Sequence, residues 1–368
     1  MKVGLLIDGD CSKGVTPATR FGEMFEEAVL ADELGFHSWG VPEQHFAAPN
    51  MTTASQDALL ATVAARTKQL RIRFAAVTAA PYNHPVQTVE RVSMMDNITG
   101  GRAELALARG NARETMDVFG VDPSETREIQ DEMIRATAAI FSTEEGQAFE
   151  WHGKHWDIPR TENLTPRPVQ QPYPAMYQVA SSADSCKSAG EKGLGVLFLD
   201  NYLGWDYIDA QLAAYAAGRA SMEPIGKRIT EHRAFYCPSV LCAPTDELAL
   251  EDGAIQAVPW FEYIHGMYQN FYKQAGYEYF ELIETVVAKH KDLAWMRDHT
   301  PSVMIGTPEY MVEKFLELER RGVDEVLMRV DGWDHERHMR TIELIGKYVI
   351  PEVSGDADTA ALAGAVAD

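Results

Sequence analysis

The sequence contains little cysteine. Its four cysteines, Cys11, Cys186, Cys237 and Cys242, show neither the spacing of a disulfide framework nor that of a zinc site. A disulfide-stabilised secreted scaffold is therefore not expected, and the simplest location for the protein is the reducing cytoplasm.

Long apolar runs are also missing. No segment approaches the roughly 20 apolar residues that a membrane-spanning helix needs. Residues 1–8 have the pattern of a short buried strand. They do not form a signal peptide, because their apolar run is too short and no cleavage-like site follows it. We therefore expect neither a membrane anchor nor an export signal.

Basic residues are scarce relative to acidic ones. The chain has 33 lysines and arginines against 55 aspartates and glutamates, which gives a formal net charge of −22. Nucleic acids and anionic lipids attract positively charged surfaces, so neither is expected as a partner. The length of 368 residues suits either one α/β barrel with insertions or two smaller domains.

Several catalytic and binding motifs are absent from the sequence. There is no Gly-x-Gly-x-x-Gly or phosphate loop after a predicted strand, and no Gly-x-Ser-x-Gly elbow for acyl transfer. The pairs His152-x-x-His155 and His335-x-x-His338 have a spacing that a metal can use. No carboxylate or cysteine accompanies either pair in a recognisable pattern, so we predict that the protein has no metal site.

Strand-like and helix-like segments alternate along the chain. Short apolar runs of strand length are followed by segments whose apolar residues recur with helical spacing. The predicted strands are residues 3–7, 38–41, 70–78, 102–108, 175–180, 196–199, 234–241 and 325–330. Eight strand–helix units predict a (β/α)8 barrel, or TIM barrel, as a single domain over residues 1–350, followed by a weakly ordered tail at 351–368.

Two segments interrupt this alternation. Residues 146–174 are rich in Trp, Pro and Gly and predict a small hairpin with an extended connector. Residues 243–300, between the seventh strand and its helix, predict a helical insertion crowded with aromatic side chains from Trp260 to Phe280. A lid over a hydrophobic or aromatic substrate would use such residues. Plain helix packing or a subunit contact is the alternative.

Polar side chains gather where the predicted strands end, which is where barrel enzymes place their active sites. These residues are Glu43, His45, Asn83, Arg109, Asn111, Ser181, Ser182 and Ser185. The Arg109 guanidinium and the serines, together with free N–H groups at the start of the following helix, can bind one phosphate. His45 is the best candidate for proton transfer, because imidazole titrates near neutral pH.

Several short motifs, in their order and spacing, resemble the bacterial luciferase-like flavin monooxygenase family over about residues 1–350. They are Pro-Glu-Gln-His-Phe at 42–46, Asn-His-Pro-Val-Gln-Thr-Val-Glu-Arg at 83–91, Asp96 through Gly101-Arg102, Ala-Arg-Gly at 108–110, Val-Ala-Ser-Ser-Ala-Asp-Ser at 179–185 and Ile-Gly-Thr-Pro-Glu-Tyr at 305–310.

The resemblance implies a (β/α)8 barrel that binds FMN at the C-terminal rim. It matches Glu43 and His45, the expected catalytic residues, to the acidic and imidazole groups beside the isoalloxazine. It also matches Ala75-Ala76 to a position where many members have a non-proline cis peptide behind the flavin ring. The residues expected to contact the cofactor, with the phosphate ligands first, are Arg109, Ser182, Ser185, Ala75, Ala76, Asn83 and Asn111.

Two positions depart from the light-emitting members of the family. Gln44 stands where they have a second histidine, and Ala108 stands where luciferase carries a reactive thiol. Glutamine cannot act as a general base, so aldehyde-oxidising light emission is not expected. A non-luminescent relative is the better match.

The expected activity is that of a two-component, FMN-dependent monooxygenase that oxygenates a small hydrophobic or aromatic substrate with O2. Because no nicotinamide site is recognisable, a separate NAD(P)H:flavin reductase is expected to supply reduced FMN. We also expect a homodimer. Two alternatives stay open: a deazaflavin-dependent hydride-transfer oxidoreductase on the same barrel, and a flavin-binding protein without catalytic activity.

Overall fold

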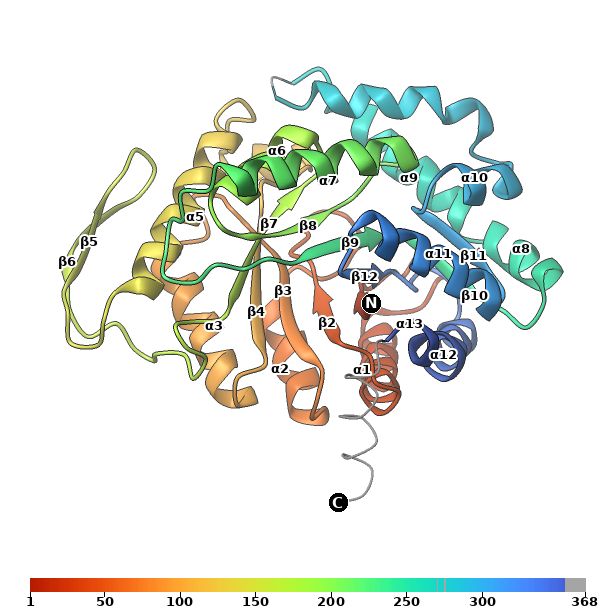
Figure 1. Ribbon diagram of the computed structural model, residues 1–368, viewed down its shortest axis with the longest axis horizontal. Coiled ribbons are helices and arrows are strands. Elements are labelled where there is room, and N and C mark those ends of the chain that lie inside the picture. The colour runs from red at the N-terminus through yellow and green to blue at the C-terminus, as the bar shows by residue number, and fades with distance from the viewer. Residues whose placement is uncertain (270, 275, 355–368) are drawn as a thin grey trace.

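Eight parallel strands close into a barrel at the centre of the molecule (Figure 1). The computed structural model describes residues 1–269, 271–274 and 276–354. In order around the barrel, the strands are β1 (Lys2–Leu6), β12 (Glu325–Met328), β9 (Arg233–Cys237), β8 (Gly195–Phe198), β7 (Ala175–Ala180), β4 (Ala103–Ala108), β3 (Arg71–Thr78) and β2 (Ser38–Val41). The predicted (β/α)8 fold is confirmed. Within the described ranges, no helix is long and apolar enough to cross a membrane.

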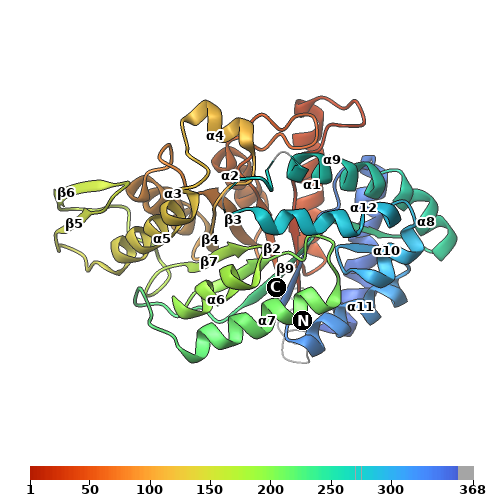
Figure 2. The same cartoon turned by 90° about the horizontal axis from the view of Figure 1, so that it is seen from above.

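Helices surround the barrel on its outer side (Figures 1 and 2). They are α1 (Pro17–Glu33), α2 (Gln56–Arg66), α3 (Pro85–Thr99), α4 (Arg113–Phe119), α5 (Thr126–Ser142), α6 (Ala183–Glu191), α7 (Trp205–Ala220), α11 (Pro308–Arg321) and α12 (His335–Leu344). Local sequence fixes several of their starts. Thr307, for example, accepts a hydrogen bond from the backbone N–H of Tyr310, and Pro308 opens the first turn of α11.

The predicted strand at 234–241 is wrong as a single element. The chain forms β9, breaks at Pro238, and then forms β10 (Ser239–Cys242). Proline has no backbone N–H to give to a strand ladder, so it separates the two strands. β9 stays in the barrel between β8 and β12, whereas β10 pairs with β11 (Val303–Gly306) in a separate two-stranded sheet.

The two interruptions of the barrel take different forms. β5 (Phe149–His152) and β6 (Asp157–Thr161) form an antiparallel hairpin that projects away from the barrel in Figure 1. Residues 243–300, called the insertion below, contain α8 (Asp246–Ala254), α9 (Ala257–Gln269), the 3-10 helices η1 (Glu278–Thr285) and η2 (Val287–Lys289), and α10 (Leu293–His299). Helices α8, α9 and α10 lie together on one side of the barrel in Figures 1 and 2.

The predicted start of the weakly ordered tail at residue 351 is wrong. After α12 the chain continues as a π-helical turn, η3 (Ile345–Val349), and then as α13 (Ile350–Val353). Pro351 does not end the helix, because proline is tolerated in a first turn. The rest of the predicted tail, residues 355–368, lies outside the described residues.

A buried ion-pair cluster fills the N-terminal end of the barrel. Arg73 donates from Nε to Glu104 Oε2 at 2.7 Å and from Nη2 to Glu325 Oε2 at 2.8 Å. Because β3 and β12 are not neighbours in the sheet, this contact crosses the barrel interior. Burial raises the pKa of both glutamates, but attraction to Arg73 outweighs it and holds both values below the ordinary range.

Replacing Arg73 by Met should destabilise the fold by about 3–5 kcal/mol, because two buried carboxylates lose their shared cation. The control is Arg113→Met, which removes an exposed ion pair to Asp117 and should cost about 0–0.5 kcal/mol. Chemical denaturation measures both. The Arg73 effect should shrink as the pH falls below the ordinary glutamate pKa, because protonation ends the contribution of groups whose folded pKa is lowered. A similarly small loss of unfolding free energy in both variants would show that Arg73 does not stabilise the two buried glutamates.

Candidate active site

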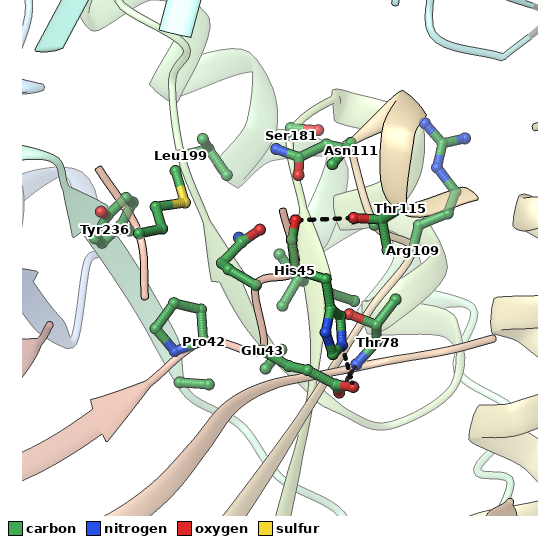
Figure 3. A pocket seen from close by; sticks show the side chains of 18 of the residues that line it. Pro42, Glu43, His45, Thr78, Arg109, Asn111, Thr115, Ser181, Leu199 and Tyr236 are labelled. Atoms are coloured by element: carbon green, nitrogen blue, oxygen red, sulfur yellow. Dashed lines mark hydrogen bonds and ion pairs between the residues drawn. The ribbon is translucent and has the colours of Figure 1, made fainter. Parts of the chain in front are cut away.

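A cavity of about 1390 Å³, counted with its open mouth, lies at the carboxyl ends of the barrel strands (Figure 3). The polar side chains that line it include Asp8, Glu43, Gln44, His45, Thr78, Arg109, Asn111, Thr115, Gln130, Ser181, Ser185, Tyr236 and Tyr279. Most of the site residues that were predicted from their position at strand ends therefore line this one cavity.

The carboxylate of Glu43 is held by three donors at the end of β2. The Asn83 amide donates to its two oxygens at 3.0 and 2.9 Å, and the Thr78 N–H donates at 3.1 Å. His45 Nε2 lies 3.2 Å from Glu43 Oε1. Asn83 itself is not among the residues that line the cavity, so its part here is to hold Glu43.

The His45 ring sits at the cavity wall among aromatic rings. It meets the edges of Phe119 and Tyr82 with centroids 5.1 and 5.7 Å away. Since a carboxylate only accepts hydrogen bonds, the Nε2 that faces Glu43 carries a proton, and Nδ1 of a neutral ring is left as an acceptor. Thr115 donates to the backbone carbonyl of His45 at 3.1 Å and fixes the loop that carries it (Figure 3).

The peptide bond between Ala75 and Ala76 is cis, at the position that the family resemblance singled out. The pairing of β3 with β4 shifts register between Phe74 and Val77, at this same point. Gln56 donates to the Ala76 carbonyl at 2.6 Å, and the Glu43 N–H donates to it at 3.2 Å. Both alanines line the cavity, so this wall is backbone and small side chains that let a flat ligand approach closely.

Arg109 leaves the end of β4 and contacts the insertion. Its Nη2 donates to the Gly276 carbonyl at 2.9 Å and to the Tyr279 hydroxyl at 3.2 Å. Its guanidinium also lies 3.7 Å from the centre of the Tyr277 ring, a cation–π contact. The Tyr279 hydroxyl is 2.7 Å from Ser181 Oγ, so one phenol bridges the arginine and the serine.

The predicted serines divide into two roles. Ser182 is the N-cap of α6, and its Oγ accepts from the Ser185 N–H at 3.4 Å. Ser182 does not line the cavity, whereas Ser181 and Ser185 do. The α6 N-terminus therefore lies beside the cavity with Ser181, Ser185, Arg109 and Tyr279 around it, and such a group of donors suits an anion.

Several residues that line the cavity were not predicted from the sequence, and Asp8 and Tyr236 are two of them. Asp8 follows β1 by two residues, and Tyr236 lies in β9. Asp8 occupies the same strand-end position as Glu43, and that position was the signal available in the sequence. Tyr236 gave no signal, because its strand was predicted too long and its end misplaced.

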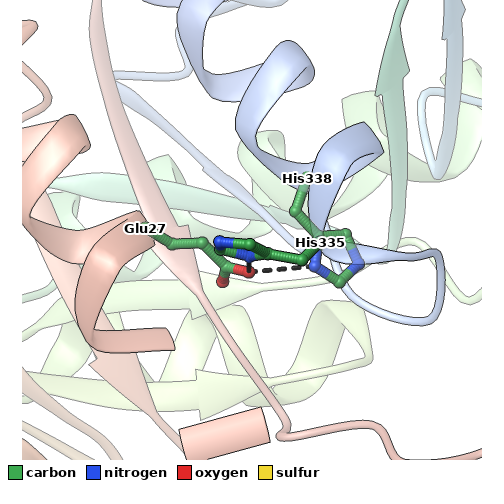
Figure 4. A group of neighbouring side chains, drawn as sticks. All are labelled: Glu27, His335 and His338. Carbon is green, nitrogen blue, oxygen red and sulfur yellow. Dashed lines mark hydrogen bonds and ion pairs between the residues drawn. The ribbon is translucent and has the colours of Figure 1, made fainter. Parts of the chain in front are cut away.

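A second group of ionisable side chains lies away from this cavity, between α1 and α12 (Figure 4). Glu27 Oε1 is 3.3 Å from His335 Nδ1 and 2.9 Å from His338 Nδ1. Arg20 donates to both oxygens of Glu27, at 2.7 and 2.8 Å. The Trp333 N–H donates to His338 Nε2, so Nδ1 of a neutral His338 carries the proton. A metal ion would have to displace Arg20, and we interpret the group as a buried ion-pair cluster.

This chain is similar in sequence or in fold to several known proteins. The oxygenase component of the flavin-dependent trigonelline monooxygenase of Acinetobacter baylyi is 25% identical over 346 residues, covering 91% of this chain and 90% of that protein. The oxygenating constituent of 3,6-diketocamphane monooxygenase from Pseudomonas putida, a type II Baeyer–Villiger monooxygenase solved with FMN, superposes with a TM-score of 0.77 at 19% identity, covering 96% and 99% of the two chains.

An F420-dependent secondary alcohol dehydrogenase, solved with an F420–acetone adduct, superposes with a TM-score of 0.72 at 16% identity, covering 96% and 99% of the two chains. At these identities the structural similarities show a common fold. The sequence profile of luciferase-like monooxygenases matches residues 1–325. That match covers most of the barrel, including the ends of β2, β3, β4 and β7, and the chain therefore belongs to the luciferase-like monooxygenase family.

Proposed function

We propose that this protein is the FMN-dependent oxygenase of a two-component monooxygenase. The observation that carries the proposal is the group of anion donors at the α6 N-terminus, placed across a cavity wall of small residues from Glu43 and His45. The similarity to a protein described as an oxygenase component supports a separate reductase as partner. We expect the oxygenase to act as a homodimer.

The residues at the cavity fit the parts of FMN. Arg109, Ser181, Ser185 and Tyr279 would hold the phosphate, with Ser182 capping the helix behind them. This assignment revises the expectation from sequence, which placed Ser182 itself on the phosphate. The flat wall of Ala75 and Ala76 would face the isoalloxazine, and Asn111 lines the same cavity.

In the proposed reaction, the cofactor and the side chains of the protein have different roles. Reduced FMN supplies the electrons that activate O2. Glu43 fixes the ring of His45 through Nε2, which leaves Nδ1 to accept or deliver a proton at the reacting oxygen. Trp260, Ile264 and Phe280 of the insertion line the cavity and exclude water from it.

Arg109→Ala should weaken FMN binding by about tenfold or more, because charge-assisted hydrogen bonds contribute roughly 1.5–3 kcal/mol each. Riboflavin, which lacks the phosphate, should lose much less. Arg127→Ala, an exposed arginine in the first turn of α5, is the control and should leave both affinities unchanged. Fluorescence titration measures the affinities of the wild type and both variants for FMN and for riboflavin. Equal losses for the two flavins in Arg109→Ala would refute the phosphate assignment.

Tyr279→Phe should open the insertion over the cavity, because it removes the hydroxyl that joins the insertion to Arg109 and Ser181. With protein in excess over reduced FMN, release of hydrogen peroxide after mixing with O2 should become several-fold faster, since water reaches the site. Tyr272→Phe makes the same change in the same insertion, at a side chain that does not line the cavity. An unchanged rate in a folded Tyr279→Phe protein would favour plain helix packing or a subunit contact.

His45→Asn should keep FMN affinity within about threefold and lower product formation by ~10²–10⁴-fold, the usual contribution of a positioned acid or base. The matched control is His84→Asn. His84 accepts the Val86 N–H as the N-cap of α3, and asparagine can replace it there. Product formation near the wild-type level in His45→Asn would remove His45 from the mechanism.

A deazaflavin-dependent hydride transfer is the second candidate, because an F420-dependent enzyme shares the fold. Cofactor titration separates the two. Tighter binding of FMN than of a deazaflavin supports the oxygenase, and the reverse order supports hydride transfer.

A further inference from the structure

The cavity has a second polar end, across the barrel from the anion donors. In the ring of eight strands, β4 lies opposite β12, and β7 lies opposite β1. Arg109 follows β4 and Ser181 follows β7, whereas Asp8 follows β1 and Arg329 follows β12. The second end is therefore as far from the first as the rim allows. Figure 3 likewise shows Tyr236 and Arg109 on opposite sides.

Asp8 is the central group of this second end. Asp8 is 3% exposed as a residue and lines the cavity. Oδ2 accepts from Arg329 Nε at 2.7 Å and from the Tyr236 hydroxyl at 3.3 Å. Among the described residues, none donates a hydrogen bond to Oδ1. A carboxylate oxygen that no protein group donates to, on a residue that lines a cavity, is suited to a ligand's donor.

The charge around Asp8 determines which ligand groups can approach. Arg329 also donates to Asp10 at 2.8 Å, and Asp331 accepts from Arg20. Burial, reinforced by Asp331 and Asp10 and opposed by Arg329, raises the pKa of Asp8 to about 6. Near neutral pH the group is mainly a carboxylate that accepts hydrogen bonds.

Three kinds of ligand group fit this end poorly. A cation gains little at Asp8, because the carboxylate is already paired with the buried Arg329 guanidinium, which lies 3.5 Å from the centre of the Trp260 ring. An anion would meet the carboxylate of Asp8. A bare carbonyl has no proton to give to Oδ1. A neutral hydroxyl can donate to Asp8 Oδ1 or to Tyr236 Oη, whose own proton already points to Asp8.

The rest of the cavity determines the body of the ligand. Its apolar lining includes Leu6, Met51, Leu197, Leu199, Trp260 and Ile264. Resting on the proposed function, we propose that Asp8 and Tyr236 anchor the substrate, and that the substrate is a mostly apolar molecule with a neutral hydroxyl group. Binding the hydroxyl at this end turns the apolar body toward the middle of the cavity, between the anion donors and His45.

The test uses calorimetric titration of the protein, with and without FMN, by four probes of one shape. They are 4-ethylphenol, 4-ethylanisole, 4-ethylbenzoate and 4-ethylbenzylamine, which differ in offering a neutral hydroxyl, its methyl ether, an anion or a cation. The wild type should bind 4-ethylphenol about tenfold more tightly than 4-ethylanisole, as expected of the one hydrogen bond that the phenol hydroxyl can donate at this end. The charged probes should bind the FMN-loaded protein more weakly than the phenol does.

Tyr236→Phe should reduce the preference for the phenol to less than about threefold. This variant carries the test because it breaks no ion pair, whereas Asp8→Asn also takes a carboxylate from Arg329. Tyr263→Phe, in α9 and not among the residues that line the cavity, is the matched control and should keep the full preference. Equal binding of phenol and ether by the wild type, tighter binding of a charged probe by the FMN-loaded protein, or a preference unchanged in both Tyr236→Phe and Asp8→Asn would overturn the anchor.

The same samples separate this inference from the proposed function. A protein that fails to bind FMN but prefers the phenol would refute the FMN assignment and leave the anchor standing. A protein that binds FMN without preferring the phenol would do the reverse.

Discussion

The closure of eight parallel strands into one barrel is the constraint on which the candidate site depends. It brings the carboxyl ends of all eight strands to one rim, so residues far apart in sequence, such as Glu43, Arg109 and Tyr236, line a single cavity. The opposite end is closed by Arg73 and its two glutamates. Stability and function therefore occupy different ends of the same strands.

Two carboxylates at this rim differ because of their neighbours. Glu43 accepts from Asn83, the Thr78 N–H and His45, so it is held in place and orients the imidazole. Asp8 is held by Arg329 and Tyr236 through one oxygen only. The first arrangement suits a group that positions another residue. The second suits a group that binds a ligand.

Strand positions followed from the sequence where local pattern and tertiary structure agree. The strands 38–41 and 175–180 match β2 and β7 in both bounds, and the resemblance singled out Ala75-Ala76, where the peptide bond is cis. Pattern failed at Pro238, where an apolar run continues across a residue that cannot pair. The pattern also does not distinguish the roles of Ser181 and Ser182. The residue at which α6 begins determines that Ser182 caps the helix and that Ser181 lines the cavity. The contact of Tyr279 with Arg109 joins residues 170 positions apart, and no local signal encodes it.

The insertion couples the proposed cofactor site to the surroundings of the substrate. Its η1 helix contacts the anion donors through Tyr279, while α9 places Trp260 against Arg329. Isotope labelling shows whether the protein transfers an oxygen atom from O2 to its substrate. With chemically reduced FMN, ¹⁸O₂ and hydroxylated apolar compounds, we predict ¹⁸O in the product. Anaerobic turnover with a reduced deazaflavin, and no label in the product, would contradict the account.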